Sequence, residues 1–147
     1  MEPGPLSGVG AAMLITRWTP GPAASTVGPV LISVTDFQAN RLRDLPGIYQ
    51  AGLTLRRAWP HLPGAVGMWL WTSPRQGRCG SVSIWQDEES LHRFVAWPDH
   101  VTIMRRYRGR GQLRATTWPG THPDPAAWAQ ARSYLSGNKL GNSNPRH

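Results

Sequence analysis

One histidine, His100, has the sequence surroundings that a base or an iron ligand inside an apolar site would need. Ile103, Met104 and Tyr107 follow it at helical spacing, so the four side chains are predicted to share one inward helix face. A neutral imidazole placed there can ligate a metal or act as a general base. The alternative is a structural histidine that hydrogen-bonds a backbone carbonyl near the start of its helix.

Aromatic and apolar side chains near His100 in the predicted fold are candidates for contacting a ligand. Aromatic rings can stack on a planar ligand, and a tyrosine hydroxyl can hydrogen-bond a ligand oxygen. Packing in the core is the alternative role for each of these residues. The candidate ligand-binding residues are Tyr49, Trp85, Phe94, Trp97, Met104 and Tyr107.

Several classes of catalytic and metal site lack their motifs in this chain. Cys79 is the only cysteine, and the histidines lie far apart, so we predict neither a thiolate cluster nor a zinc site. We predict Cys79 to be a small buried apolar residue. A phosphate-binding glycine loop, a Ser-His-Asp order and a dinucleotide fingerprint are also absent. These absences argue against hydrolase and nucleotide-dependent functions.

The chain is strongly basic, with a formal charge of +8. Its arginines concentrate in residues 41–57 and 105–114, and no nucleic-acid-binding motif accompanies them, so we expect no nucleic-acid partner. We favour the interpretation that the arginines of residues 105–114 lie on a solvated helix face. The alternative is that four of them bind an acidic ligand group such as a heme propionate; these are Arg105, Arg106, Arg108 and Arg110.

The termini give no targeting signal that we recognise. The N-terminus lacks the order of a signal peptide, and no apolar run approaches the roughly 18 residues of a membrane span. We therefore expect a cytoplasmic protein without a membrane span.

The alternation of apolar residues predicts strands over residues 30–35, 65–72, 80–85 and 113–118. A helix is predicted from Asp44 to Trp59, where Pro60 ends it. A second helix begins at Asp87, is interrupted at Pro98 and continues, with Asp99 as a second cap, to Tyr107. The predicted fold class is α+β, a ferredoxin-like βαββαβ unit with a four-stranded antiparallel sheet.

Three segments follow from the distribution of glycine and proline. Residues 1–29 are predicted to be a flexible N-terminal segment with room for one extra strand, and the true start, Met1 or Met13, stays open. Residues 30–118 form the predicted domain. Residues 119–147 are predicted to contain a short helix over 126–135 and a disordered tail.

Both faces of the predicted sheet are expected to be apolar. In the second strand Val66, Met68 and Leu70 are expected on one face, with Trp69 and Trp71 on the other. Two helices cover only one face of such a sheet, so we expect a homodimer in which the second faces stack. The alternative is that the N-terminal segment or the C-terminal helix covers this face within one chain.

The run GSVSIWQDEESLHRF at residues 80–94 resembles the strand-Trp-helix signature of the antibiotic-biosynthesis monooxygenase superfamily. The continuation WPDHVTIMRR at residues 97–106 is similar to the spheroidene-monooxygenase-like and related uncharacterised branch. The resemblance implies a dimeric α+β barrel with a ligand pocket between the sheet and the helices. It implies no single chemistry, because the superfamily includes cofactor-free oxygenases, heme enzymes and members without known activity.

One departure from the heme-degrading branch concerns the iron ligand. Counting from Trp85, the position that corresponds to the ligating histidine of that branch lies nearer Met104 in this chain. The position that corresponds to its partner tryptophan lies nearer Phe94. Heme degradation by that arrangement is therefore not predicted, whereas heme ligation by His100 stays open.

These observations predict a monooxygenase-type oxidoreductase that acts on a small apolar or aromatic substrate. It would work either without a cofactor or with heme ligated by His100. The alternative is a non-catalytic dimeric module that binds heme or another hydrophobic ligand. A basic adaptor for anionic surfaces is a third hypothesis.

Overall fold

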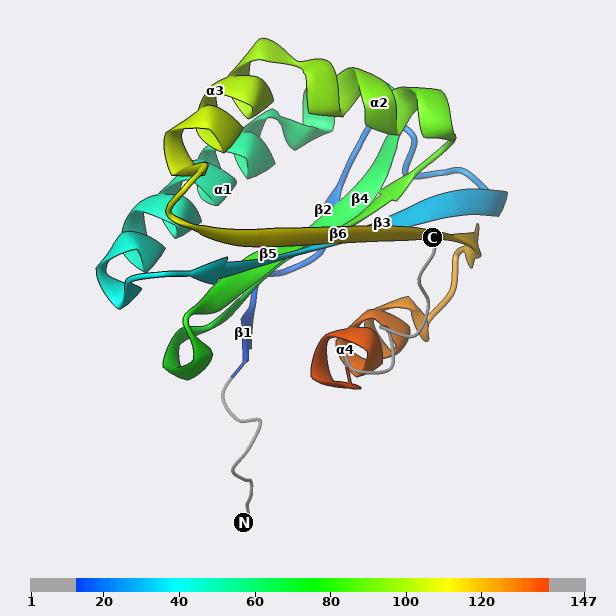
Figure 1. The fold of residues 1–147 in the computed structure, drawn as a ribbon. Helices are drawn as coiled ribbons and strands as arrows, with labels where there is room; N and C mark the ends of the chain where they lie inside the picture. Colours follow the sequence, from blue (N-terminus) through cyan, green and yellow to red (C-terminus); the bar gives the residue numbers. More distant parts are fainter. Residues whose placement is uncertain (1–12, 138–147) are drawn as a thin grey trace.

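An antiparallel sheet runs through the middle of the protein in a computed structural model that describes residues 13–137 (Figure 1). The strand order is β1-β4-β5-β3-β6, and β2 also pairs with β4. The strands are β1 (Leu14–Ile15), β2 (Thr19–Pro20), β3 (Gly28–Ala39), β4 (Ala65–Ser73), β5 (Arg78–Trp85) and β6 (Gly111–His122).

Three helices lie on one side of the sheet and a fourth lies on the other (Figure 1). The first three are α1 (Leu45–Ala58), α2 (Glu88–Ala96) and α3 (Pro98–Tyr107), and α4 (Ala127–Gly137) lies opposite them. Short 3-10 turns occur at Leu42–Asp44, Trp59–His61 and Pro74–Gln76. The chain follows the order β3-α1-β4-β5-α2-α3-β6, which confirms the predicted ferredoxin-like α+β fold.

Local sequence signals account for the break between α2 and α3. Asp87 caps α2, because its Oδ1 accepts a hydrogen bond from the backbone N–H of Ser90 at 2.8 Å. Pro98 is the first residue of α3, where proline is tolerated. The prediction that Asp99 caps α3 is wrong, because Trp97 holds the cap position and Asp99 lies in the first turn. Asp44 precedes α1 without a side-chain cap bond.

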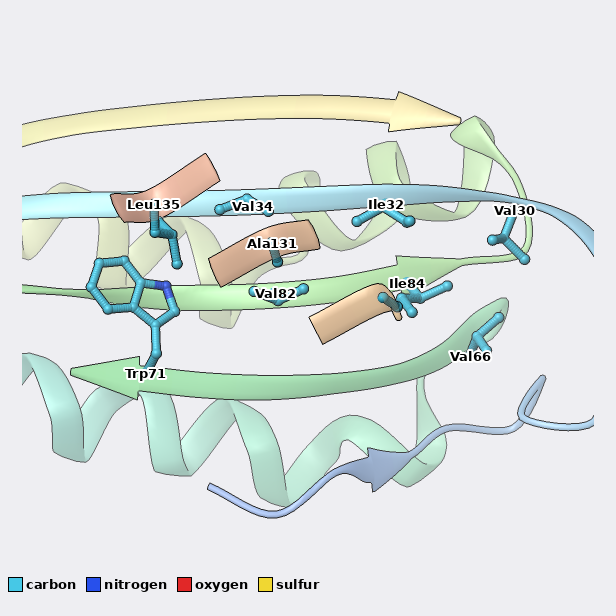
Figure 2. Close-up of a cluster of buried hydrophobic side chains, with 10 residues drawn as sticks. Val30, Ile32, Val34, Val66, Trp71, Val82, Ile84, Ala131 and Leu135 are labelled. Atoms are coloured by element: carbon cyan, nitrogen blue, oxygen red, sulfur yellow. The ribbon is translucent and has the colours of Figure 1, made fainter. Parts of the chain in front are cut away.

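The sheet face opposite α1–α3 is covered by α4 and by the segment that contains Trp18. Figure 2 shows side chains of β3, β4 and β5 meeting Ala131 and Leu135 of α4. Both α4 residues are fully buried. The cluster comprises Val30, Ile32, Val34, Val66, Trp71, Val82, Ile84, Ala127, Ala131 and Leu135.

Arg78 links α4 to the sheet by hydrogen bonds. Its guanidinium donates to the backbone carbonyl of Leu135 at 3.1 Å and to the two carboxylate oxygens of Asp36 at 3.1 and 2.7 Å. Because Asp36 is buried and the last carbonyls of a helix lack partners within it, this arginine satisfies both groups.

The prediction that the second sheet face is uncovered within one chain is therefore wrong. Its apolar character was the physical argument for a dimer by sheet stacking, and α4 buries that surface within the chain. The alternative prediction is that the N-terminal segment or the C-terminal helix covers this face within one chain. That alternative is correct, because both segments pack there.

The prediction that both faces are apolar is only partly right for the two central strands, β3 and β5, whose helix side is mixed and includes apolar residues such as Leu31 and Trp85. On the helix side, β3 and β5 carry hydroxyl side chains, which are Ser33, Thr35, Ser81 and Ser83. In β4, Val66 lies with the α4 cluster instead of with Met68, because a bulge between Ala65 and Gly67 shifts the alternation by one residue.

Within residues 13–137, no helix is long and apolar enough to cross a membrane. Ser136 and Gly137, predicted to begin the disordered tail, are instead the last two residues of α4, and the rest of that tail lies outside the described residues.

Candidate functional site

A cavity of about 710 Å³ lies between the helix side of the sheet and helices α1, α2 and α3. Its floor comes from β3–β6, and its walls come from apolar side chains such as Ile48, Leu55, Leu91 and Ile103. The edge strand β6 contributes floor residues that are exposed, among them Leu113 at 44%. The cavity therefore opens over β6, beneath α3.

Hydroxyl groups make up the centre of the floor. The Oγ atoms of Thr35 and Ser81 lie 2.9 Å apart and hydrogen-bond each other, and the backbone N–H of Ser81 donates to Thr35 Oγ1 at 3.0 Å. Ser83 Oγ accepts a hydrogen bond from Trp85 Nε1 at 2.9 Å. These hydroxyls are held by neighbouring strands, so they are rigid polar points beneath an apolar space.

His100 lies in the cavity wall with its tautomer fixed by a backbone carbonyl. Its Nδ1 lies 3.1 Å from the carbonyl oxygen of Val95, so Nδ1 carries the proton and donates it. Nε2 then carries a lone pair, and it has no hydrogen-bond partner among residues 13–137. The Phe94 ring packs against the imidazole with ring centroids 4.6 Å apart.

Burial lowers the pKa of His100 from its ordinary value of 6.5, and the hydrogen bond to Val95 opposes that shift. Burial has this effect because it penalises the charged imidazolium. At neutral pH the ring is therefore neutral, which is the form that a general base or a metal ligand requires.

The structural and functional readings of His100 are compatible in this geometry. The carbonyl bond expected of a structural histidine is present, and it orients Nε2 by fixing the other ring nitrogen. Metal-bound and catalytic histidines are commonly held by the same kind of bond.

Four of the other predicted site residues belong to the cavity wall: Tyr49, Phe94, Met104 and Tyr107. Tyr49 comes from α1 and is 36% exposed. Tyr107 ends α3 and places its hydroxyl against Gly47 of α1, where an added Cβ would lie 2.7 Å from that oxygen. The fold thus brings two tyrosines, a methionine and a phenylalanine to the same space as His100.

The structure does not bring Trp85 and Trp97 into the wall. Trp85 is completely buried, and it packs against Trp59 with centroids 4.9 Å apart. Trp97 contacts Phe94 from outside the cavity, with centroids 6.2 Å apart. In this structure both tryptophans are packing residues.

Trp59 also belongs to the wall, and no sequence pattern had marked it as a site residue. It follows α1 in a 3-10 turn and is 1% exposed. Its indole N–H is buried without a hydrogen-bond partner among the described residues.

Cys79 also lines the cavity, and burial raises the pKa of its thiol to about 11, with a smaller contribution from the Asp36 carboxylate. The side chain is therefore a neutral thiol at physiological pH, as a small buried apolar residue would be.

The arginines at the end of α3 divide into two groups. Arg105 and Arg108 are exposed members of the cavity wall. Arg106 is not part of the wall, and Arg110 pairs with Asp44 at 3.4 Å. No group of three or more His, Cys, Asp or Glu residues suited to a metal ion occurs in residues 13–137.

Sequence reasoning missed the hydroxyl floor, although a signal for it was present. In residues 32–35 the apolar side chains of Ile32 and Val34 alternate with the hydroxyl side chains of Ser33 and Thr35. Ser81 and Ser83 repeat that alternation around Val82 and Ile84. This alternation indicates that the side chains of Ser33, Thr35, Ser81 and Ser83 share a face that meets a polar environment or an open space over that stretch.

No protein-family model matches the chain, and no curated protein is significantly similar to it in sequence. Similarity appears among solved structures. A candidate antibiotic biosynthesis monooxygenase from Nitrosomonas europaea aligns with a TM-score of 0.59 at 9% identity, over 65% of this chain and 94% of that one.

Two further structures are similar over most of their own length. The heme-degrading enzyme LmHde from Listeria monocytogenes has a TM-score of 0.53 and 16% identity, over 74% of this chain and 72% of that one. A dimeric ferredoxin-like protein of unknown function from Jannaschia sp. CCS1 has a TM-score of 0.54 and 13% identity, over 60% and 97%. The chain therefore has the ferredoxin-like fold of the antibiotic-biosynthesis monooxygenase-like proteins.

Proposed function

We propose that this protein is a small cytoplasmic monooxygenase-type oxidoreductase that binds an apolar, planar substrate in the cavity beneath α1–α3. The observation that carries the proposal is the orientation of His100. Its Nε2 belongs to a neutral imidazole in the cavity wall, held by the Val95 carbonyl and without a partner among the described residues.

The proposed chemistry begins with a proton transfer from the substrate to Nε2. An acidic C–H or phenolic O–H would lose its proton to His100, and the apolar walls would keep water from the resulting anion. That anion supplies the electrons that reduce oxygen. For a methylene substrate, one oxygen atom replaces the two hydrogens as a carbonyl and the other leaves as water, so no external reductant is needed.

The hydroxyl floor would position the substrate during this step. Ser81 and Thr35 form a hydroxyl pair, and whichever hydroxyl accepts within the pair keeps its own O–H to donate to a ligand oxygen. Tyr49 and Tyr107 supply further hydroxyls from α1 and α3. Phe94 and Met104 supply apolar surface for the rings.

Heme fits the donor set as a second form of the same proposal. His100 offers a neutral Nε2 whose ring is oriented through Nδ1, and the surrounding walls are apolar. When bound, heme would supply iron-based oxygen chemistry. His100 would then hold the iron, and Tyr49, Phe94 and Met104 would contact the ring system.

Two measurements on the same set of variants test the proposal. Purified protein is titrated with hemin while the visible spectrum is recorded, and oxygen uptake is measured with anthrone, whose methylene is acidified by its flanking carbonyl-conjugated rings. We expect His100→Ala to abolish whichever signal the wild type gives. His92→Ala is the matched control, because His92 is an exposed histidine on α2 outside the cavity.

The results separate the versions of the proposal. A saturable Soret shift that His100→Ala removes supports heme ligation, and anthrone-dependent oxygen uptake lost in the same variant supports the cofactor-free version. If the wild type gives neither signal, or if His92→Ala loses it equally, His100 is not the centre of an oxidoreductase site.

A non-catalytic binding module is the second candidate function, and one observation favours it. His100 is the only histidine in the cavity wall, and no aspartate or glutamate accompanies it among the described residues. An apolar cavity with one histidine and no carboxylate in its wall suffices for binding. Saturable hemin or anthrone binding without oxygen uptake would support this function.

We further propose that the protein acts as a homodimer, in line with the dimeric neighbour from Jannaschia sp. CCS1. Because α4 covers the sheet face, another surface must make the contact. In the described residues β6 is a long edge strand that pairs only with β3, so its free backbone groups can pair with a second copy.

A further inference from the structure

We propose that the ligand of the cavity is an apolar or aromatic acid, whose anionic group is bound by Arg105 and Arg108 at the opening over β6. The inference deepens the proposed function and rests on it, because it assumes that the cavity holds an apolar ligand. It adds the charge of that ligand and the orientation in which it lies.

The first support is the distribution of charge in the cavity wall. Arg105 and Arg108 contribute two positive charges, and the wall contains no aspartate or glutamate among the described residues. His100 adds no positive charge at neutral pH, because burial lowers its pKa. Positive charge at the mouth of an apolar cavity focuses the electric field and attracts anions.

The second support is that these two arginines lack partners within residues 13–137. Arg110, three residues from the end of α3, is paired with Asp44, and Arg93 on α2 is paired with Glu89. No ion pair or hydrogen bond involves the side chains of Arg105 or Arg108 in the described part of the chain. Both guanidinium groups are therefore available to a carboxylate.

The third support is the shape of the cavity. Its inner part is closed by buried side chains such as Trp59 and Met68, whereas Leu113 on β6 is 44% exposed at the open side. An amphipathic ligand fits this gradient in one orientation only. The apolar body lies inward beside His100, and the acid lies outward between α3 and β6.

The test compares two probes of nearly the same shape, naphthoate and its uncharged amide naphthamide. Their affinities for the full chain are measured by isothermal titration calorimetry at neutral pH. We expect naphthoate to bind the wild type about tenfold more tightly than naphthamide, the difference that charge-assisted hydrogen bonds typically produce.

Two variants localise that preference. Arg105→Gln combined with Arg108→Gln should weaken naphthoate binding about tenfold and leave naphthamide binding within about twofold. Arg106→Gln should change neither affinity, because Arg106 lies on the same helix turn outside the cavity wall. Glutamine preserves helix propensity, so α3 should stay folded.

The outcomes distinguish the inference from the proposed function. Equal binding of naphthoate and naphthamide would overturn the acid preference and leave an apolar binding cavity in place. An equal loss in Arg106→Gln would also overturn it, because the effect would then be one of overall charge. If neither probe binds the wild type, the inference and the proposed substrate cavity both fail.

Discussion

At the scale of single residues, the candidate site depends on one backbone hydrogen bond. His100 Nδ1 donates to the carbonyl oxygen of Val95, and this bond decides that Nε2 is the nitrogen with a lone pair. The acceptor is a carbonyl near the end of α2, and the donor lies in the first turn of α3. The break at Pro98 therefore positions the imidazole, because it sets these two helix ends against each other.

The lowered pKa of His100 predicts a pH dependence of stability. The unfolded chain takes up a proton near pH 6.5, whereas the folded chain does so at a lower pH. The unfolded state thus binds more protons below pH 6.5, so the free energy of unfolding falls as the pH is lowered through this range. Urea unfolding should show this loss in the wild type and a smaller loss in His100→Gln.

The control for that comparison is His92→Gln, which removes an exposed histidine from α2. It shows how removing a histidine outside the cavity affects stability, and the change in His100→Gln is compared with it. A slope unchanged in His100→Gln would mean that burial does not favour the neutral imidazole in the folded chain.

A second prediction concerns the buried guanidinium of Arg78. Arg78→Leu leaves the Asp36 carboxylate and the Leu135 carbonyl without this donor, in a region where the Arg78 and Asp36 side chains are 13% and 5% exposed. We expect a loss of about 3 kcal/mol in the free energy of unfolding, as for other buried pairs that lose one partner. Chemical denaturation measures it.

Arg114→Leu is the matched control, because Arg114 contacts the same Asp36 oxygen as Arg78, at 3.4 Å, from a side chain that is 65% exposed. Its removal should cost less than about 1 kcal/mol. Equal losses in the two variants would show that burial of Arg78 adds nothing to the pair.

At the scale of elements, α4 decides which face of the sheet is covered and which is left to form the cavity. It packs Ala131 and Leu135 against β3–β5, and Arg78 holds its last turn (Figure 2). The strands on that side carry valine, isoleucine and tryptophan, whereas the cavity side of the central strands carries hydroxyls. The two faces are therefore divided between a packed core and an open site.

Separation of the faces predicts that α4 can be displaced without destroying the cavity. Ala131→Glu would place a charge at a fully buried position of α4, so the helix should detach at a cost of about 3 kcal/mol. We expect lower helix content by circular dichroism and greater accessibility of the tryptophans to a quencher. Binding of naphthamide in the cavity should persist.

Ser133→Glu adds the same charge to the exposed side of α4. It should leave the helix content and the accessibility of the tryptophans to the quencher unchanged. Loss of naphthamide binding in Ala131→Glu would contradict the independence of the two faces.

At the scale of the whole molecule, the arrangement of layers changes the expected mode of association. Sheet stacking would require α4 to leave its face, whereas pairing through β6 requires no rearrangement of the described residues. The opening of the cavity also lies over β6, so a second copy on that edge would lie beside Arg108 and the cavity mouth.

Light scattering after size exclusion tests this association directly. We expect the full chain to elute as a dimer, and Ala131→Glu to keep that state because the contact does not involve α4. A monomer at every protein concentration would exclude the homodimer. A dimer that forms only when α4 is displaced would indicate sheet stacking instead.

The sequence by itself determined the order of elements and the inward face of α3. Alternation in the strands and the spacing of His100, Ile103, Met104 and Tyr107 are local signals, and the structure places all four side chains in the cavity wall. Asp87 and Pro98 likewise set helix ends through their own backbone chemistry. Such features depend on neighbours within a few residues, which the sequence lists directly.

Only the tertiary structure decided what covers each face of the sheet. The apolar residues of β4 are compatible with a second chain or with α4, and the choice depends on contacts between residues about 60 positions apart, such as Arg78 with Leu135. Only the tertiary structure likewise decided the positions of Trp85 and Trp97. Their residue type suits stacking on a ligand, but both lie outside the cavity wall. Residue type limits the chemistry that is available, whereas long-range packing decides which side chains reach a shared space.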